Sequence, residues 1–217
     1  MAGCCTQSEV GRLFNGRVAA KDARRYRRRG LTGTARTLTE LAGDVRGTSV
    51  LGVGGGIGAI ELELLQAGAA RATSIELSGA YETEAELLLA ERGLAGRVDR
   101  RVGDFVVDGA TVDQHDVVVL HRVVCCYPDA DALVGAAADH ARKTLLLTYP
   151  QDRAVIRAGV RVVNLFLRLS RCGFRAYAHR VETIVAVAAQ HGLTLEKRER
   201  AGAIWESAVF SASRAGS

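Results

Sequence analysis

A glycine-rich turn is the part of the sequence best suited to bind a small ligand. Residues 49–65 run from a short apolar stretch through Gly54, Gly56 and Gly58 into a helix-like pattern. Glycines at this spacing let the backbone approach a ligand closely, and the N–H groups at a helix start favour electron-rich groups. Glu76 follows the next apolar stretch, about 20 residues on, where a carboxylate can accept both hydrogen bonds of a ribose diol. The pattern indicates a nucleoside site.

A third polar position, Asp104, helps to distinguish between two nucleoside cofactors, S-adenosylmethionine and NAD. Asp104 and Phe105 follow the third apolar stretch, where the carboxylate can accept from an adenine amino group beside an aromatic ring. The spacing of Gly54, Gly56 and Ala59 also satisfies the dinucleotide fingerprint, so NAD stays an alternative. Asp104 favours S-adenosylmethionine. We therefore assign eight residues to cofactor binding: Gly54, Gly56, Gly58, Glu76, Leu77, Asp104, Phe105 and His121.

Residues after the fourth apolar stretch are the candidates for chemistry. In an open α/β sheet the ligand lies beyond the carboxyl ends of the strands, which places His121, Arg122 and Tyr127 near the bound ligand. His121 can deprotonate a phenol or amine, whereas Arg122 can hold a carboxylate that needs no deprotonation. The alternative is that His121 caps a strand end and Arg122 pairs with a surface acid. His179 is a further candidate site residue.

Alternating apolar and helix-length segments must position these residues. Val- and Leu-rich stretches without polar alternation are buried on both faces, and their alternation with helices predicts βαβ units in a parallel sheet. Strands are expected at Ser49–Val53, Ala72–Glu76, Val98–Val102, Asp116–Leu120 and Thr144–Thr148. Helices are expected between them at Ile57–Gln66, Ala80–Arg92 and Asp131–Arg142, and later at Arg153–Arg171 and Val181–Gln190.

The end of the chain completes this fold class. Two last strands, Leu193–Arg200 and Ile204–Ser211, are separated by a linker short enough for a hairpin. The expectation is a doubly wound, Rossmann-like α/β fold with a seven-stranded sheet, mostly parallel, closed by an antiparallel C-terminal hairpin. We expect residues 1–47 to form an N-terminal helical appendage and residues 48–213 to form the cofactor-binding domain. With 48% hydrophobic residues, the composition excludes disorder and collagen-like order.

Arginine dominates the basic residues. The net charge is +5, and only three of the 29 basic residues are lysines. Arginines gather in the run 24–29 and on the expected helix Arg153–Arg171, where five of them fall within an arc of about 80°. A basic amphipathic helix can clamp an acidic substrate, lie on a membrane surface, or present a solvated face. Genomic bias is another explanation, and no recognition motif favours nucleic acid.

The cysteines do not form a disulfide framework. Five cysteines, in the adjacent pairs Cys4-Cys5 and Cys125-Cys126 plus Cys172, predict reduced thiols. The pairs permit a metal-binding interpretation, but adjacent ligands suit one metal poorly, so we expect no metal. Without a charged leader or an apolar run of about 18 residues, we expect a cytoplasmic protein with no integral membrane segment.

Over about residues 40–212 the chain resembles the class I S-adenosylmethionine-dependent methyltransferases. The motifs are Val50–Gly58, Ile75–Ser78, Gly103-Asp104 and Asp116–Arg122. The segments His121–Pro128 and Phe174–His179 resemble a bacterial branch labelled magnesium-protoporphyrin O-methyltransferase. Tyr26 falls where the chlorophyll-pathway enzymes carry a tyrosine, so the resemblance makes it a fourth catalytic candidate, although Cys126 stands where those enzymes are expected to have a functional histidine. The glycine motif of the class usually opens with an acid, but here it opens with Gly52.

This resemblance implies transfer of a methyl group from S-adenosylmethionine to a small-molecule acceptor, at an oxygen of a carboxylate or hydroxyl. An acidic small molecule suits the arginine excess. The alternatives are an NAD-dependent oxidoreductase and a non-catalytic protein that binds a cofactor or a metal.

Overall fold

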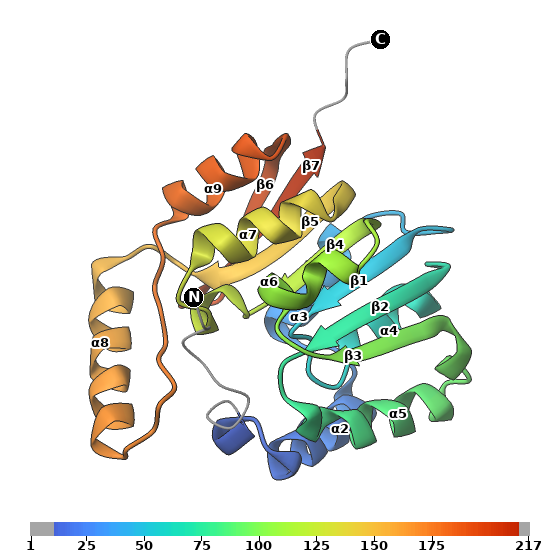
Figure 1. The fold of residues 1–217 in the computed structure, drawn as a ribbon, viewed down its shortest axis with the longest axis horizontal. Coiled ribbons are helices and arrows are strands. Elements are labelled where there is room, and N and C mark those ends of the chain that lie inside the picture. The colour runs from blue at the N-terminus through green and yellow to red at the C-terminus, as the bar shows by residue number, and fades with distance from the viewer. Residues whose placement is uncertain (1–10, 213–217) are drawn as a thin grey trace.

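The computed structural model describes residues 11–212, which form a seven-stranded sheet flanked by helices (Figure 1). The strand order is β3-β2-β1-β4-β5-β7-β6. The strands are β1 (Ser49–Val53), β2 (Arg71–Glu76), β3 (Val98–Val102), β4 (His115–His121), β5 (Ala141–Pro150), β6 (Leu193–Ala201) and β7 (Trp205–Ala212). Strands β1 to β5 pair in parallel, and β7 pairs antiparallel with both β5 and β6. The fold class predicted from the sequence is confirmed.

Several element boundaries differ from the prediction, most of all around residue 140. The helix expected to reach Arg142 ends at Asp139, and β5 begins at Ala141 rather than Thr144. The reason is tertiary pairing, because Ala141 is in register with His115 at the start of β4. Helical periodicity alone cannot detect this partner.

Helices cover both faces of the sheet. The α-helices are α2 (Gly16–Arg29), α3 (Gly33–Leu41), α4 (Ala59–Gln66), α5 (Glu82–Glu91), α6 (Phe105–Asp108), α7 (Ala130–Asp139), α8 (Ala154–Leu169) and α9 (Val181–Gln190). Short 3-10 turns are η1 (Gly79–Tyr81), η2 (Ala95–Arg97), η3 (Gly109–Thr111) and η4 (Val124–Cys126). Helices α2 to α5 contribute to one apolar cluster, and α6, α7 and α9 contribute to the other.

Successive residues of a strand pack alternately into the two apolar clusters, which lie on opposite faces of the sheet. Val118 and Leu120 of β4 pack with α7 and α9, whereas Val117 and Val119 pack with the helices of the opposite face. Since side chains alternate along a strand, a sheet covered on both faces needs apolar residues at every position. This explains why the central strands show no polar alternation.

The N-terminal helices share the core of the sheet. Asn15 begins α2, because its side-chain oxygen accepts hydrogen bonds from the N–H groups of Arg17 and Val18. Gly30 ends α2 at φ 61°, as its position after the arginine run predicted. Leu38 of α3 is fully buried, and α3 contacts β5, β7 and α4. The sequence predicted helix here but not this packing.

Helix α8 stands at one side of the molecule (Figure 1). It lies along the extended segment 172–180, to which Asn164 binds through two hydrogen bonds with the backbone of Ala176. In the part of the chain that the structure describes, no helix is both long enough and apolar enough to cross a membrane.

Candidate functional site

A cavity of about 600 Å³ opens at the carboxyl ends of the central strands. Its wall includes ten of the eleven residues that the sequence assigned to cofactor or catalysis: Tyr26, Gly54, Gly56, Glu76, Leu77, Asp104, Phe105, His121, Arg122 and Tyr127. Gly58 is the exception and is not part of the lining. Parallel strands end at one edge of the sheet, so residues far apart in the sequence meet there.

The glycine turn between β1 and α4 is held by backbone and close packing. Gly54 has φ 63°, and its N–H donates to the carbonyl of Ile75 at 2.8 Å. A Cβ at Gly54 would lie 2.8 Å from Val123 Cγ2, so the turn leaves no room for a side chain. Gly58, at φ 73°, is the left-handed residue that begins α4. Its role is to turn the chain into the helix.

The carboxylate of a buried glutamate, Glu61, lies next to Gly52, the position at which the glycine motif usually has an acid. Glu61, in the first turn of α4, is 3% exposed. A Cβ built at Gly52 would collide with Glu61 Oε1, and one at Gly55 would also meet this carboxylate. The Glu61 carboxylate therefore fills the space beneath the glycine turn that a side chain at position 52 would enter. The sequence offered one signal for Glu61, which is an acid on the apolar face of α4.

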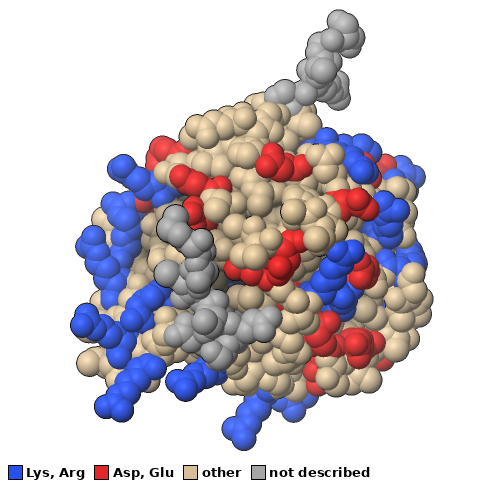
Figure 2. Space-filling view, viewed as in Figure 1, with Lys and Arg blue, Asp and Glu red and all other residues tan. Residues whose placement is uncertain are grey.

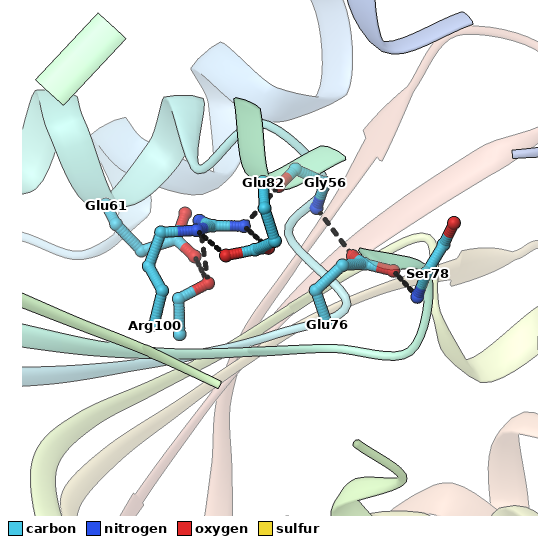
Figure 3. A network of polar contacts seen from close by, with 7 residues as sticks. Gly56, Glu61, Glu76, Ser78, Glu82 and Arg100 are labelled. Atoms are coloured by element: carbon cyan, nitrogen blue, oxygen red, sulfur yellow. Dashed lines mark hydrogen bonds and ion pairs between the residues drawn. The ribbon is translucent and has the colours of Figure 1, made fainter. Parts of the chain in front are cut away.

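Glu76 binds the glycine turn through its carboxylate (Figure 3). One oxygen accepts the N–H of Gly56 at 2.8 Å, and the other accepts the N–H of Ser78 at 2.9 Å. Burial raises the pKa of Glu76, and these two backbone bonds partly oppose the rise. Each oxygen keeps a second lone pair, so the carboxylate can still accept from a ligand in the cavity.

Arg100 of β3 binds the same turn on the side of Gly56 away from Glu76 (Figure 3). Its guanidinium donates to both oxygens of Glu82, at 2.7 and 3.0 Å, and to the carbonyl of Gly56 at 3.0 Å. Burial alone lowers the pKa of Arg100, but the bonds and charge of Glu82 outweigh it and raise the pKa. No local pattern in the sequence marks Arg100, because its partners come from other elements.

Asp104 and Tyr127 meet at another part of the wall. Asp104 begins α6, where its side chain accepts the N–H of Val106 at 3.0 Å. The Tyr127 hydroxyl donates to the Asp104 carboxylate at 3.3 Å. Phe105 is buried beside them and packs edge-to-face on His140. Tyr127, expected at the acceptor, is thus in contact with a residue expected at the cofactor.

His121 is a buried titratable group of the cavity wall. Its Nε2 lies 2.8 Å from the Thr34 hydroxyl, which α3 brings to the end of β4. Burial, with a further contribution from Arg122, lowers the pKa of His121 to about 4. The ring is therefore neutral at pH 7, and Nε2 accepts the Thr34 proton when Nδ1 carries the ring hydrogen.

Arg122 presents a charged group to the cavity. It is one of two non-glycine residues with positive φ (60°) in the described part of the chain. Its guanidinium stacks over the Trp205 ring at 4.5 Å, and burial, together with Arg25, lowers its pKa. Among residues 11–212, the structure records no carboxylate paired with Arg122. The arginine is available to an anionic ligand.

Two further candidates use their polar groups elsewhere. The ring of Tyr26 reaches the cavity wall, but its hydroxyl donates to Glu63 at 2.8 Å. Burial, and then Glu63, raise the pKa of Tyr26 above its usual value, so the hydroxyl stays protonated. His179 Nε2 lies 2.9 Å from the Tyr127 carbonyl oxygen and is outside the cavity lining.

The side chains of Cys125 and Cys126 line the cavity. Their sulfurs are 3.7 Å apart, and the contact with Cys126 lowers the pKa of Cys125. No cluster of three or more His, Cys, Asp or Glu side chains suited to a metal occurs within residues 11–212. Cys4 and Cys5, which the metal-binding interpretation requires, lie outside the described residues.

Distant segments add wall residues that the sequence analysis did not assign to the site. Trp205 comes from the start of β7, Phe174 from segment 172–180, and Thr34 from α3. Phe174 packs edge-to-face on Phe14. No motif or spacing marks Trp205 or Thr34, whereas Phe174 lies in the segment Phe174–His179 that carries part of the family resemblance. Only the packing of the chain brings the three residues to the sheet edge.

No family model and no curated protein matches this sequence. Solved structures match its fold. Magnesium protoporphyrin IX methyltransferase from Synechocystis PCC 6803, with bound SAH, superimposes with a TM-score of 0.67 at 19% identity, over 83% of this chain and 82% of that chain. A putative S-adenosylmethionine-dependent methyltransferase from Listeria monocytogenes gives a TM-score of 0.67 at 13% identity, over 82% and 97%.

An O-methyltransferase family protein from Burkholderia thailandensis gives a TM-score of 0.72 at 17% identity, over 92% of this chain and 59% of that one. The fold is therefore that of the S-adenosylmethionine-dependent methyltransferases, as the sequence resemblance predicted. The particular branch indicated by the sequence, magnesium-protoporphyrin O-methyltransferase, is represented among these similar structures.

Proposed function

We propose that this protein is an S-adenosylmethionine-dependent methyltransferase that methylates an oxygen of a small acidic molecule. The observation that carries the proposal is one cavity in which Glu76, Asp104 and the glycine turn line one part and His121 and Arg122 line another. The fold of solved methyltransferases supports it, two of which contain SAM or SAH.

The cavity wall fits the cofactor by the chemistry of its groups. The Glu76 carboxylate suits a ribose diol, and Asp104 beside Phe105 suits an adenine amino group. The glycine turn offers backbone at close range, held by Glu61 from beneath. Bound there, S-adenosylmethionine supplies an electrophilic methyl group on a sulfonium.

The residues near the acceptor favour a carboxylate over a hydroxyl. With its pKa lowered to about 4, His121 is a weak base for a phenol or alcohol at pH 7. Arg122 has the forked donors that bind a carboxylate, and Arg25 adds positive charge to the same wall. A carboxylate needs no deprotonation, so holding and aligning it while water is excluded supplies the acceleration.

We also propose that the N-terminal appendage, of which the structure describes residues 11–47, acts as a cover over the acceptor part of the cavity. Arg25 and Tyr26 of α2 and Thr34 of α3 all contribute to its wall. Acceptor choice then depends on this segment, together with Phe174 and Trp205.

The test of cofactor use is calorimetric titration with S-adenosylhomocysteine and with NAD. We expect saturable binding of S-adenosylhomocysteine and no binding of NAD. The affinity for S-adenosylhomocysteine should fall at least tenfold in Glu76→Ala, because two hydrogen bonds to a charged acceptor are lost. Glu86→Ala, which removes an exposed acid from α5, is the matched control. Saturable binding of NAD alone would overturn the assignment as an S-adenosylmethionine-dependent methyltransferase.

Acceptor class is tested with radiolabelled S-adenosylmethionine and panels of aromatic and aliphatic acids, phenols and amines. We expect methyl esters from the acids, with KM raised at least tenfold in Arg122→Gln and kcat changed less. Transfer to phenols or amines that is unaffected by Arg122→Gln would contradict the assignment.

A further inference from the structure

Helix α8 exposes an apolar surface of unusual extent. Ten large hydrophobic side chains are exposed in the described part of the chain, and six of them lie on this one helix. They are Val155, Val162, Val163, Leu165, Phe166 and Leu169, and the last two are 66% and 71% exposed. Scattered exposed hydrophobics are ordinary on a protein surface, but a contiguous set marks an interaction site.

The exposed apolar surface faces away from the protein. The side of α8 turned toward the body carries Ile156, Val160, Asn164 and Leu167, which are all half-buried. Their spacing of three and four residues defines one stripe along a helix. Leu165 and Leu169 fall across the axis from this stripe, so the chain itself does not cover them.

Arginine flanks the same surface, without acidic residues. Residues 153–171 contain five arginines and no Asp or Glu. They are Arg153, Arg157, Arg161, Arg168 and Arg171, and Arg157 pairs with Asp152 just before the helix. Figure 2 shows Lys and Arg along the edge of the molecule where Figure 1 places α8. The helix thus combines a cationic side with an outward apolar side.

We propose that α8 docks this protein on the surface of an anionic lipid bilayer. Its apolar side chains enter the interface and its arginines contact the acidic headgroups, which is the pattern of helices that lie in the membrane plane. Charge favours this occupant over a second copy of the chain. A second α8 would offer these arginines no carboxylate to pair with, because residues 153–171 contain no Asp or Glu.

The attachment of α8 connects the docked surface to the cavity. Asn164 holds segment 172–180, whose Phe174 lines the cavity and whose Tyr177 N–H donates to the Cys125 carbonyl at 2.7 Å. A bilayer bound to α8 therefore lies on the side of the molecule where this segment borders the cavity. The docking proposal stands on α8 alone and does not depend on methyl transfer.

Vesicle flotation of the full chain tests the proposal. We expect the protein to float with phosphatidylcholine vesicles that contain roughly 30% phosphatidylglycerol, and not with pure phosphatidylcholine. Phe166→Ser with Leu169→Ser should weaken partitioning at least about 30-fold through lost apolar burial. Arg161→Gln with Arg168→Gln should weaken it roughly 30-fold through the loss of two interfacial charges.

Matched variants control for general surface effects and for folding. Leu87→Ser with Val107→Ser removes two exposed apolar side chains from α5 and α6, and Arg71→Gln with Arg142→Gln removes two exposed charges near the starts of β2 and β5. Both should float like the unaltered protein, and circular dichroism should show all variants folded.

Three results would overturn the proposal. One is a wild-type protein that does not float, or that floats equally with neutral vesicles. Another is flotation that the α8 variants leave unchanged. The third is a dimer in light scattering that Phe166→Ser with Leu169→Ser dissociates, without any vesicle binding.

Discussion

The contact between Gly52 and Glu61 makes the sharpest prediction about the site. Gly52 lies inside β1, whose extended backbone suits alanine, so the effect of Gly52→Ala comes from the added Cβ alone. That Cβ would collide with the Glu61 carboxylate, which is buried and also accepts from the Ser74 hydroxyl at 3.3 Å. Overpacking of this kind costs about 1–3 kcal/mol of unfolding free energy.

A double-mutant cycle isolates this contact. In a Glu61→Ala background the Cβ meets no carboxylate, so the cost of Gly52→Ala should nearly vanish and leave a coupling of about 1–3 kcal/mol. Gly96→Ala is the control, because a Cβ there meets open space and reports only the effect of alanine on the unfolded chain.

The assay is urea unfolding, combined with calorimetry of S-adenosylhomocysteine binding. If Glu61 replaces the motif acid, Glu61→Ala should weaken binding, and Gly52→Asp in that background should restore part of it. The reasoning is refuted if Gly52→Ala costs as much in the Glu61→Ala background as in the unaltered protein, or if it costs no more than Gly96→Ala.

Three further predictions concern titration and stability. NMR should show the His121 ring titrating near pH 4. The rate of methyl transfer should therefore show no dependence on His121 ionisation between pH 6 and 8. A titration midpoint of His121 above pH 6 would contradict the buried geometry. The Ser49 N–H, and then Lys143, lower the pKa of Asp116 to about 2. The stability that ionised Asp116 contributes is present above about pH 4 and is lost as the pH falls toward 2. After solvent screening, Asp116→Asn should lower the free energy of unfolding by about 1 kcal/mol at pH 7. The free energy of unfolding in urea should then depend less on pH in the acid range. Tyr26→Phe should cost about 1 kcal/mol by leaving Glu63 unpaired, without changing kcat, and a large fall in kcat would assign the hydroxyl a catalytic role.

The sequence by itself determined the architecture and the edge of the sheet at which the candidate site lies. Continuous apolar strands, the glycine turn, and the polar residues after β2 and β3 are local signals, because strand burial and tight turns restrict residue type position by position. Their positions at the strand ends followed from the parallel topology, since such strands end at one edge. Gly54, Glu76 and Asp104 could therefore be placed together before any coordinates.

Only the tertiary structure decided what those groups contact. Glu61 lies against Gly52 because α4 packs on β1, and Arg100 binds the glycine turn because β3 lies beside β2. Tyr127 bonds Asp104 and Tyr26 bonds Glu63, although the sequence placed both tyrosines near the acceptor. Side-chain direction and burial depend on neighbours distant in the chain, and no local pattern encodes them. For the same reason, only the tertiary structure shows that the outward face of α8 packs against no other segment among the described residues.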